Sequence, residues 1–316
     1  MEENTSSTSF ENQGVNDNSV LIQPEEPLVN ESISLPLRRQ LSPQDTYSIT
    51  AAEKTIFFAI LGSVGSGKTT LISSIYQMFF TNELESKYMF AGSETLIGFE
   101  ERAYHLRTSS MEPEVAMKRT AVGAQDILHL RVCCVRNNEK CNLLFHDFSG
   151  EDINAINANI DAAKEEFGIV YAAKKIVLLI DGEKLQNTAQ RMPAIHRATQ
   201  ILKTFEDSGL LHQRSQIIIV VSKYDLLVND DGKPKGDFSS RIISHLQSQI
   251  PSISERLQLI NVAAAPKKSK VLRTGYGIQE LLDALLADPQ TTRKPSSIKT
   301  ELHSQFNLLK GRTTCT

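Results

Sequence analysis

The stretch Gly62-Ser-Val-Gly-Ser-Gly-Lys-Thr69 most narrowly limits what this chain can fold into. It follows an apolar run at 56–61 and precedes a segment in which Leu71, Ile75 and Met78 recur at helical spacing. A strand, a glycine-rich loop and a helix start in this order point several backbone N–H groups at one place, where a phosphate can bind. The alternative is a loop that only turns the chain. The predicted phosphate contacts are Gly62, Ser63, Val64, Gly65, Ser66, Gly67, Lys68, Thr69 and Thr70.

Strand and helix patterns alternate from residue 53 to residue 288. Short apolar runs at 56–61, 143–145, 176–180 and 217–221 suit buried strands, 127–135 suits an edge or hairpin strand, and a sixth strand ends near Val262. Between two of these runs, apolar residues predict a helix that Pro193 begins and Gly209 ends. We therefore predict an α/β domain with a six-stranded, mostly parallel sheet and helices on both faces.

Two polar segments flank this domain. Residues 1–52 and 289–316 carry few apolar side chains, so we expect disordered tails on both sides of the domain at 53–288. Within the domain, the segment at about 81–119 is longer than a minimal loop requires. Leu96, Phe99, Ala103 and Leu106 fall at helical spacing in it and predict an inserted helix.

Composition excludes several classes of protein. The formal net charge is −3, so no excess of Lys and Arg exists to neutralise a nucleic acid. The four cysteines form no C-x-x-C pair, which argues against a zinc site or a disulfide framework and favours a reducing cytoplasm. The longest apolar runs are too short to span a bilayer, so we expect no integral membrane segment.

A second motif, Asp147-Phe-Ser-Gly150, follows the apolar strand at 143–145. Downstream of a phosphate-binding loop it reads as D-x-x-G, in which Asp147 belongs to a Mg²⁺ site and the Gly150 N–H contacts the γ-phosphate. An Asp that only caps a turn is the alternative. The Thr69 hydroxyl is the other predicted Mg²⁺ ligand from this region.

The segment before the 127–135 strand contains Arg119-Thr120. Thr120 precedes a strand that pairs into the D-x-x-G strand, so it is our candidate for a further Mg²⁺ hydroxyl, with Thr95, Thr108 and Ser110 as competitors. Arg119 beside it could offset γ-phosphate charge, as well as simply solvate a loop.

Two side chains join Arg119 as catalytic candidates. Lys68 neutralises the β- and γ-phosphate oxygens in loops of this kind. Glu151 follows Gly150 and could orient the attacking water, or only favour the N-terminus of the following helix.

A third motif predicts which base is bound. Ser222-Lys-Tyr-Asp225 follows the strand at 217–221, where the Asp225 carboxylate can accept from both N1–H and the 2-amino group of guanine. The stem of Lys223 can pack over the ring, and Ser222 stands where an amide side chain is usual. A small residue after the last strand, Ala263 or Ala264, would let a backbone N–H reach guanine O6.

Taken together, these motifs resemble the bacterial double-GTPase family of the TRAFAC clade over most of residues 54–287. The resemblance rests on Phe90-Ala-Gly-Ser-Glu-Thr-Leu96, Gly98-Phe-Glu-Glu-Arg102, Arg119-Thr120, Asp147-Phe-Ser-Gly-Glu151, Asp181-Gly-Glu183, Ser222-Lys-Tyr-Asp225 and Val262-Ala-Ala-Ala-Pro266, together with the glycine-rich loop. It implies a Ras-like P-loop G domain, GTP and GDP with Mg²⁺ as ligands, and a bacterial conflict or signalling setting with a second GTPase encoded nearby. Phe148 departs from the family pattern, which favours an aliphatic residue there.

The predicted activity is hydrolysis of GTP to GDP and phosphate, with loops around Thr120 and Gly150 passing the nucleotide state to a protein partner. Two rivals stay open at this point. An ATPase would require Asp225 to be an ordinary surface residue. A GTP-binding scaffold would bind the nucleotide and hardly hydrolyse it.

Overall fold

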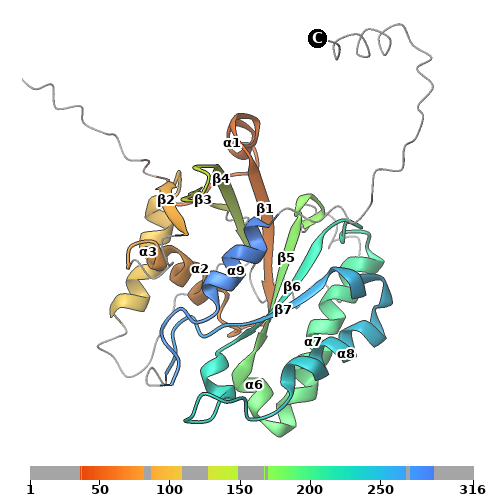
Figure 1. Ribbon diagram of the computed structural model, residues 1–316. Coiled ribbons are helices and arrows are strands. Elements are labelled where there is room, and N and C mark those ends of the chain that lie inside the picture. Colours follow the sequence, from red (N-terminus) through yellow and green to blue (C-terminus); the bar gives the residue numbers. More distant parts are fainter. Residues whose placement is uncertain are drawn as a thin grey trace, which may run out of the picture. The chain divides into compact units, whose positions relative to one another are not determined.

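Seven strands in the described part of the chain form one sheet, with helices on both of its faces (Figure 1). The computed structural model of the protein describes residues 36, 38–81, 87–108, 127–148, 167, 170–267 and 271–287. In chain order the elements are α1 (Thr46–Ala52), β1 (Thr55–Gly62), α2 (Lys68–Met78), β2 (Tyr88–Gly92), α3 (Leu96–Thr108), β3 (Ile127–Cys134), β4 (Lys140–Asp147), β5 (Lys175–Asp181), α6 (Gly182–Gln186), α7 (Thr188–Asp207), β6 (Gln216–Ser222), the 3₁₀ helix η2 (Tyr224–Leu227), α8 (Phe238–Gln249), the 3₁₀ helix η3 (Pro251–Arg256), β7 (Leu257–Asn261) and α9 (Ile278–Leu286). The alternation of elements thus yields the predicted α/β fold.

The strands lie in the order β2-β3-β4-β1-β5-β6-β7. From β4 to β7 every neighbouring pair is parallel, whereas β2 with β3 and β3 with β4 are antiparallel. Every residue of β5 is buried, as expected for a central strand that helices cover on both faces. Because parallel strands point the same way, the carboxyl ends of β1, β4, β5, β6 and β7 share one edge of the sheet.

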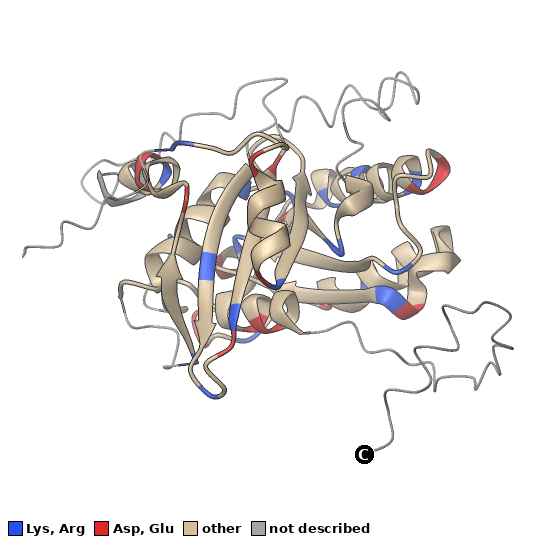
Figure 2. Ribbon diagram, turned by 90° about the horizontal axis from the view of Figure 1, so that it is seen from above, with Lys and Arg blue, Asp and Glu red and all other residues tan. Residues whose placement is uncertain are grey.

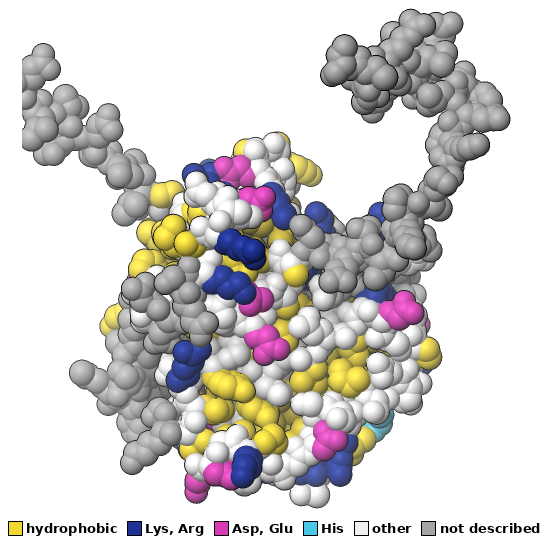
Figure 3. Space-filling view, in the orientation of Figure 1, with side chains coloured by type: hydrophobic (Ala, Val, Ile, Leu, Met, Phe, Trp, Pro, Cys, Tyr) yellow, Lys and Arg dark blue, Asp and Glu magenta, His cyan; other side chains and the backbone are white. Residues whose placement is uncertain are grey.

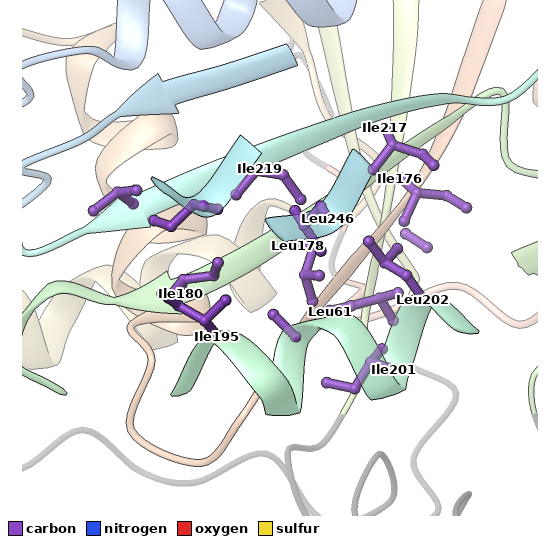
Figure 4. Close-up of a cluster of buried hydrophobic side chains, with 14 of the residues drawn as sticks. Leu61, Ile176, Leu178, Ile180, Ile195, Ile201, Leu202, Ile217, Ile219 and Leu246 are labelled. Carbon is purple, nitrogen blue, oxygen red and sulfur yellow. The ribbon is translucent and has the colours of Figure 1, made fainter. Parts of the chain in front are cut away.

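Two hydrophobic clusters pack on opposite faces of this sheet, because successive side chains of a strand point to opposite sides. Figure 4 shows one cluster, in which β1, β5 and β6 meet helices α7 and α8 through Leu61, Ile176, Leu178, Ile180, Ile195, Ile201, Leu202, Ile217, Ile219 and Leu246. On the other face, Val177 and Leu179 of β5 pack with residues of α2 and α9. Each such side chain contributes about 1.5–3 kcal/mol when it leaves water.

The part of the sheet that the structure describes has seven strands, so the prediction of six was wrong in number. The extra strand is β2, which pairs antiparallel with β3 at the edge of the sheet and is interrupted by a register shift between Phe90 and Gly92. It lies in the segment at 81–119, where the predicted helix also occurs as α3. Phe99 and Ala103 of α3 are fully buried, so its apolar stripe belongs to the core.

The expectation of a disordered tail up to residue 52 was wrong for residues 38–52. Leu41 is buried against Ile127 and Leu144, and its backbone N–H donates to the Ile127 carbonyl at 2.8 Å. Helix α1 follows, and the Glu53 carboxylate after it pairs with the Arg131 guanidinium of β3. This segment therefore adds apolar and ionic contacts to the β3–β4 end of the sheet.

The surface of the described elements mixes charges of both signs. Figure 2 shows blue and red segments interspersed along the helices and loops, consistent with the small net charge. On the face shown in Figure 3, hydrophobic side chains form several separate groups between charged and neutral polar ones. Within the part of the chain that the structure describes, every helix is too short or too polar to cross a lipid bilayer.

We predict that Gly98→Ala destabilises the protein, because of the packing between α3 and the segment before α1. Alanine is normally the better helix residue by about 1 kcal/mol. At Gly98, however, a Cβ would overlap the backbone carbonyl of Arg39 and approach Leu128. Overpacking of this kind costs about 1–3 kcal/mol, so urea denaturation should show a lower free energy of unfolding.

Gly236→Ala is the matched control, because its Cβ would meet only Phe238 ring atoms at ordinary contact distance. A more stable Gly98→Ala protein would contradict the packing of the Arg39 segment on α3.

Candidate functional site

The candidate site lies at the edge of the sheet where the parallel strands end, next to α6 in Figure 1. The register places Ile60 of β1 opposite Asp147 of β4 and pairs Asp181 of β5 with Ser222 of β6. The glycine-rich loop leaves β1 at this same edge. Strand pairing thereby brings together segments that are far apart in the sequence.

Residues 63–66 form the turn between β1 and α2, with Val64 and Gly65 exposed and Ser66 buried. Gly67 is the N-cap of α2 with φ of 87°, a left-handed conformation that favours glycine. A Cβ on Gly62 would lie 2.6 Å from Ser66 Oγ, so the start of the loop also requires glycine. The loop backbone therefore curls tightly onto the first turn of α2, which also holds Thr69 and Thr70.

The Lys68 side chain is buried inside this curl. Its Nζ donates to the Gly62 carbonyl at 2.9 Å and lies 3.5 Å from the Ser63 carbonyl. The backbone carbonyls of the glycine-rich loop thus hold the ammonium near the N-terminus of α2. Positive charge and helix N-terminus coincide there, which is the arrangement that attracts a phosphate.

The two predicted Mg²⁺ ligands that the structure describes, Asp147 and Thr69, are oxygen-bearing side chains of β4 and α2. Asp147 is the last residue of β4 and is 0% exposed, and Thr69 is half-buried in the first turn of α2. Among the described residues no three His, Cys, Asp or Glu side chains converge on a metal site. One hydroxyl and one carboxylate nevertheless fit Mg²⁺, since this ion keeps several waters and takes further oxygens from phosphates.

The loop after β6 carries the Asp225 carboxylate in a buried position. Asp225 is 2% exposed, and its Oδ2 accepts from the Lys267 backbone N–H at 3.0 Å. The Tyr224 N–H donates to the Val262 carbonyl at 3.1 Å, which ties this loop to the end of β7. A buried carboxylate at the sheet edge is not the ordinary surface aspartate that the ATPase alternative requires.

The loops after β1 and β6 are close neighbours. A Cβ built on Gly67 would lie 3.9 Å from the Ser222 Cβ. The Ser222 hydroxyl is directed to the Ile180 carbonyl at 3.3 Å, so it links β6 to β5. The glycine-rich loop and the Asp225 loop therefore border one site.

A third loop, which follows β7, completes this border. The Ala263 N–H donates to the Tyr276 carbonyl at 3.0 Å, and the Gly275 N–H donates to the Ala264 carbonyl at 3.2 Å. Tyr276 also stacks on Tyr224, with ring centroids 6.0 Å apart. Backbone hydrogen bonds to Tyr276 and Gly275 thus hold Ala263 and Ala264 beside the Asp225 loop.

Asp181 and Glu183 are site residues to which the motif analysis assigned no role. Both carboxylates contact the Lys223 ammonium, Asp181 Oδ2 at 3.0 Å and Glu183 Oε2 at 2.9 Å. The sequence signal that could have indicated a role for them is the Asp-Gly-Glu triplet at the end of the buried strand β5. Gly182 between them lies so close to the Ser222 carbonyl oxygen that a Cβ would overlap it.

Four predicted site residues, Arg119, Thr120, Gly150 and Glu151, lie outside the described residues. So does Ser110, one of the competitors of Thr120, whereas Thr108 ends α3. Thr95 lies within the described residues, and its hydroxyl contacts the backbone of His129. It accepts from the His129 backbone N–H at 2.9 Å and lies 3.4 Å from the His129 carbonyl in a fully buried position. Thr95 therefore links the start of α3 to β3 through these contacts with His129.

The fold and the position of these loops are those of a P-loop GTPase domain. A family model described as Double-GTPase 2 matches residues 56–286, which is most of the chain. The chain therefore belongs to the double-GTPase family, whose name implies binding of a guanine nucleotide. A comparison with curated proteins gave no match.

We predict that Gly182→Ala weakens nucleotide binding, because the added Cβ would push against the Ser222 and Lys223 carbonyls and displace the Asp225 loop. The loss should be at least about tenfold in Kd for labelled GDP, since displaced loops lose charge-assisted hydrogen bonds.

Gly209→Ala serves as the matched control. Gly209 has φ of 72° with open space around it, so alanine costs about 1–2 kcal/mol of stability without moving the site. Equal GDP affinity in both variants would mean that the approach of α6 does not position the Asp225 loop.

Proposed function

We propose that this protein binds GTP and GDP with Mg²⁺ and hydrolyses GTP to GDP and phosphate. The observation that carries this proposal is the buried Asp225 carboxylate in a loop that borders the glycine-rich loop. A carboxylate in that place accepts from two donors that guanine has and adenine lacks. Family membership supports the same conclusion.

The phosphates are assigned to the loop at 62–69 and the first turn of α2. The backbone N–H groups of this loop and the Lys68 ammonium would neutralise the phosphate oxygens. The Gly150 N–H would contact the γ-phosphate.

Thr69, Asp147 and Thr120 would hold the Mg²⁺ ion through a hydroxyl, a carboxylate and a second hydroxyl. The ion, when bound, supplies positive charge next to the β- and γ-phosphate oxygens.

The base is assigned to the loops after β6 and β7. Asp225 would accept from guanine N1–H and the 2-amino group, and the Lys223 stem would lie over the ring. The backbone N–H of Ala264 would donate to guanine O6, next to Ala263. Ser222 offers no amide to the base, a loss of about 0.5–1.5 kcal/mol that the Asp225 bonds, at about 1.5–3 kcal/mol, exceed.

Hydrolysis is assigned to Glu151 and Arg119 together with Lys68. Glu151 would orient the attacking water or accept its proton, and Arg119 would offset charge that develops on the γ-phosphate. The loops around Thr120 and Gly150 would then differ between the GTP and GDP states. We infer a cytoplasmic switch protein that a protein partner reads, in the setting of a bacterial conflict or signalling system with a second GTPase.

We predict that Asp225→Asn changes the preferred nucleotide from GTP to XTP. The new amide would place a donor against the guanine 2-amino group, which costs about 1–3 kcal/mol in a desolvated pocket. Xanthine carries a carbonyl there, so the amide can donate to it. Displacement of labelled GDP by GTP, ATP and XTP, on the parent and the variant, measures the preference.

Three outcomes are distinct in this competition. A switch to XTP supports guanine recognition by Asp225. Equal competition by XTP and GTP in both proteins would falsify that assignment. An ATPase would show itself in the parent, where ATP would compete at least as well as GTP.

We predict that Glu151→Gln lowers the single-turnover rate of phosphate release by roughly tenfold or more, because a positioned proton acceptor contributes at least that much. Nucleotide affinity should stay unchanged, since the side chain acts on the water and not on the base. Arg119→Ala, measured in the same way, reports on the second assigned side chain.

An unaltered rate in Glu151→Gln would remove Glu151 from the catalytic residues. A parent protein that binds GTP tightly and releases no phosphate would identify a GTP-binding scaffold.

A further inference from the structure

Lys223 differs from most lysines in a loop because two carboxylates bind its ammonium at once. Asp181 Oδ2 lies 3.0 Å from Nζ, and Glu183 Oε2 lies 2.9 Å from it. The three side chains differ in exposure: 31% for Lys223, 5% for Asp181 and 56% for Glu183. Asp181 is therefore the buried partner and Glu183 the solvated one, and a solvated partner contributes little.

Asp181 has a second bond that fixes its orientation. It is the N-cap of α6, and its Oδ1 accepts from the Glu183 N–H at 3.0 Å. It also pairs in register with Ser222, the residue directly before Lys223. With one carboxylate oxygen bound to α6 and the backbone set by the sheet, the other oxygen has a fixed position toward Lys223.

The backbone of Lys223 is equally constrained. It has φ of 51°, which is a left-handed conformation that non-glycine residues seldom adopt. Gly182 packs against its carbonyl and that of Ser222. Backbone and ammonium are thus both held, and only the aliphatic stem between them is left to contact a ligand.

Both carboxylates favour the charged form of Lys223. Burial disfavours the ammonium, but the Glu183 hydrogen bond and the Asp181 charge outweigh burial and raise the pKa of Lys223. The hydrogen bond from Lys223, followed by its charge, lowers the pKa of Glu183. Lys223 and Glu183 are therefore both charged at neutral pH.

We propose that Asp181 is a positioning residue for base recognition: it holds the Lys223 ammonium so that the lysine stem is in place before the base arrives, with Glu183 as a weaker second anchor. This inference rests on the proposed function of the Asp225 loop. An unanchored lysine would have to lose its rotamer freedom on binding, which weakens affinity by about two- to tenfold. The carboxylates also offset the lysine charge, so a base can cover it at lower desolvation cost.

The test is a double-mutant cycle on GDP and GTP affinity with Asp181→Asn and Lys223→Met. Asparagine keeps an oxygen that can cap α6 but loses the charge that binds Lys223. Methionine keeps an apolar stem and loses the ammonium. We expect Asp181→Asn to weaken both nucleotides equally, by about two- to tenfold, because the base is common to them.

In the Lys223→Met background the same Asp181→Asn change should have no further effect, since the ammonium that Asp181 positions is gone. Glu183→Gln in the parent background should weaken affinity less than Asp181→Asn, because Glu183 is more exposed. Thermal unfolding of each variant shows that it is folded, and Asp181→Ser, which can also cap a helix, replaces Asp181→Asn if that variant fails to fold.

Equal losses from Asp181→Asn in both backgrounds would overturn the proposal, because Asp181 would then act through α6 alone. No loss in the parent background would overturn it too. A parent protein that prefers another nucleotide would instead defeat the proposed function, and competition by ATP and XTP identifies that case separately.

Discussion

Parallel pairing of β4, β1, β5 and β6 is the constraint on which the rest of the structure depends. Its register fixes where each strand ends, so that the loop after Gly62, the Asp147 carboxylate and the Ser222 loop emerge at one edge. No bond between these segments is needed to bring them together. The cost of assembling the site is met by the buried strands and helices on the two faces of the sheet.

Backbone hydrogen bonds and close contacts then fix the positions of the loops at this edge of the sheet. The Tyr224 N–H bonds to Val262, and the Val262 N–H bonds to Val221 at 2.8 Å, so the loops after β6 and β7 form one unit. Gly277 lies where a Cβ would overlap the Asn261 carbonyl, which requires glycine at the start of α9. The loops that we propose to contact the base are thus joined by backbone hydrogen bonds, which is the support that a precise recognition site needs.

Sequence patterns predicted the elements whose signal is local. The buried strands β1, β5 and β6 and helix α3 agree with their apolar runs and spacing. Strand β2 was not predicted: its sequence Tyr-Met-Phe-Ala-Gly is short and does not alternate between apolar and polar residues, and the strand lies at the edge of the sheet with no fully buried residue. The Leu41 segment was taken for a tail because its burial depends on Ile127 and Leu144, far away in the sequence. Pro193 lies inside α7, which begins at Thr188 because the Asn187 side chain caps it, so the capping residue and not the proline sets the start.

The candidate site also contains residues that local motifs predict and residues whose contacts depend on the fold. Lys68 and Asp225 were predicted from motifs because phosphate and guanine recognition demand particular residue types at fixed spacing. Phe148 stands where the resemblance led us to expect an aliphatic residue, and its ring centroid lies 3.8 Å from that of His146 and 4.7 Å from that of Phe167. The contact between Asp181 and Lys223 could not be predicted from the sequence, because a carboxylate at the start of a helix is already explained as a helix cap. Its second bond, to a lysine that follows the neighbouring strand, exists only because β5 and β6 pair in parallel and in register.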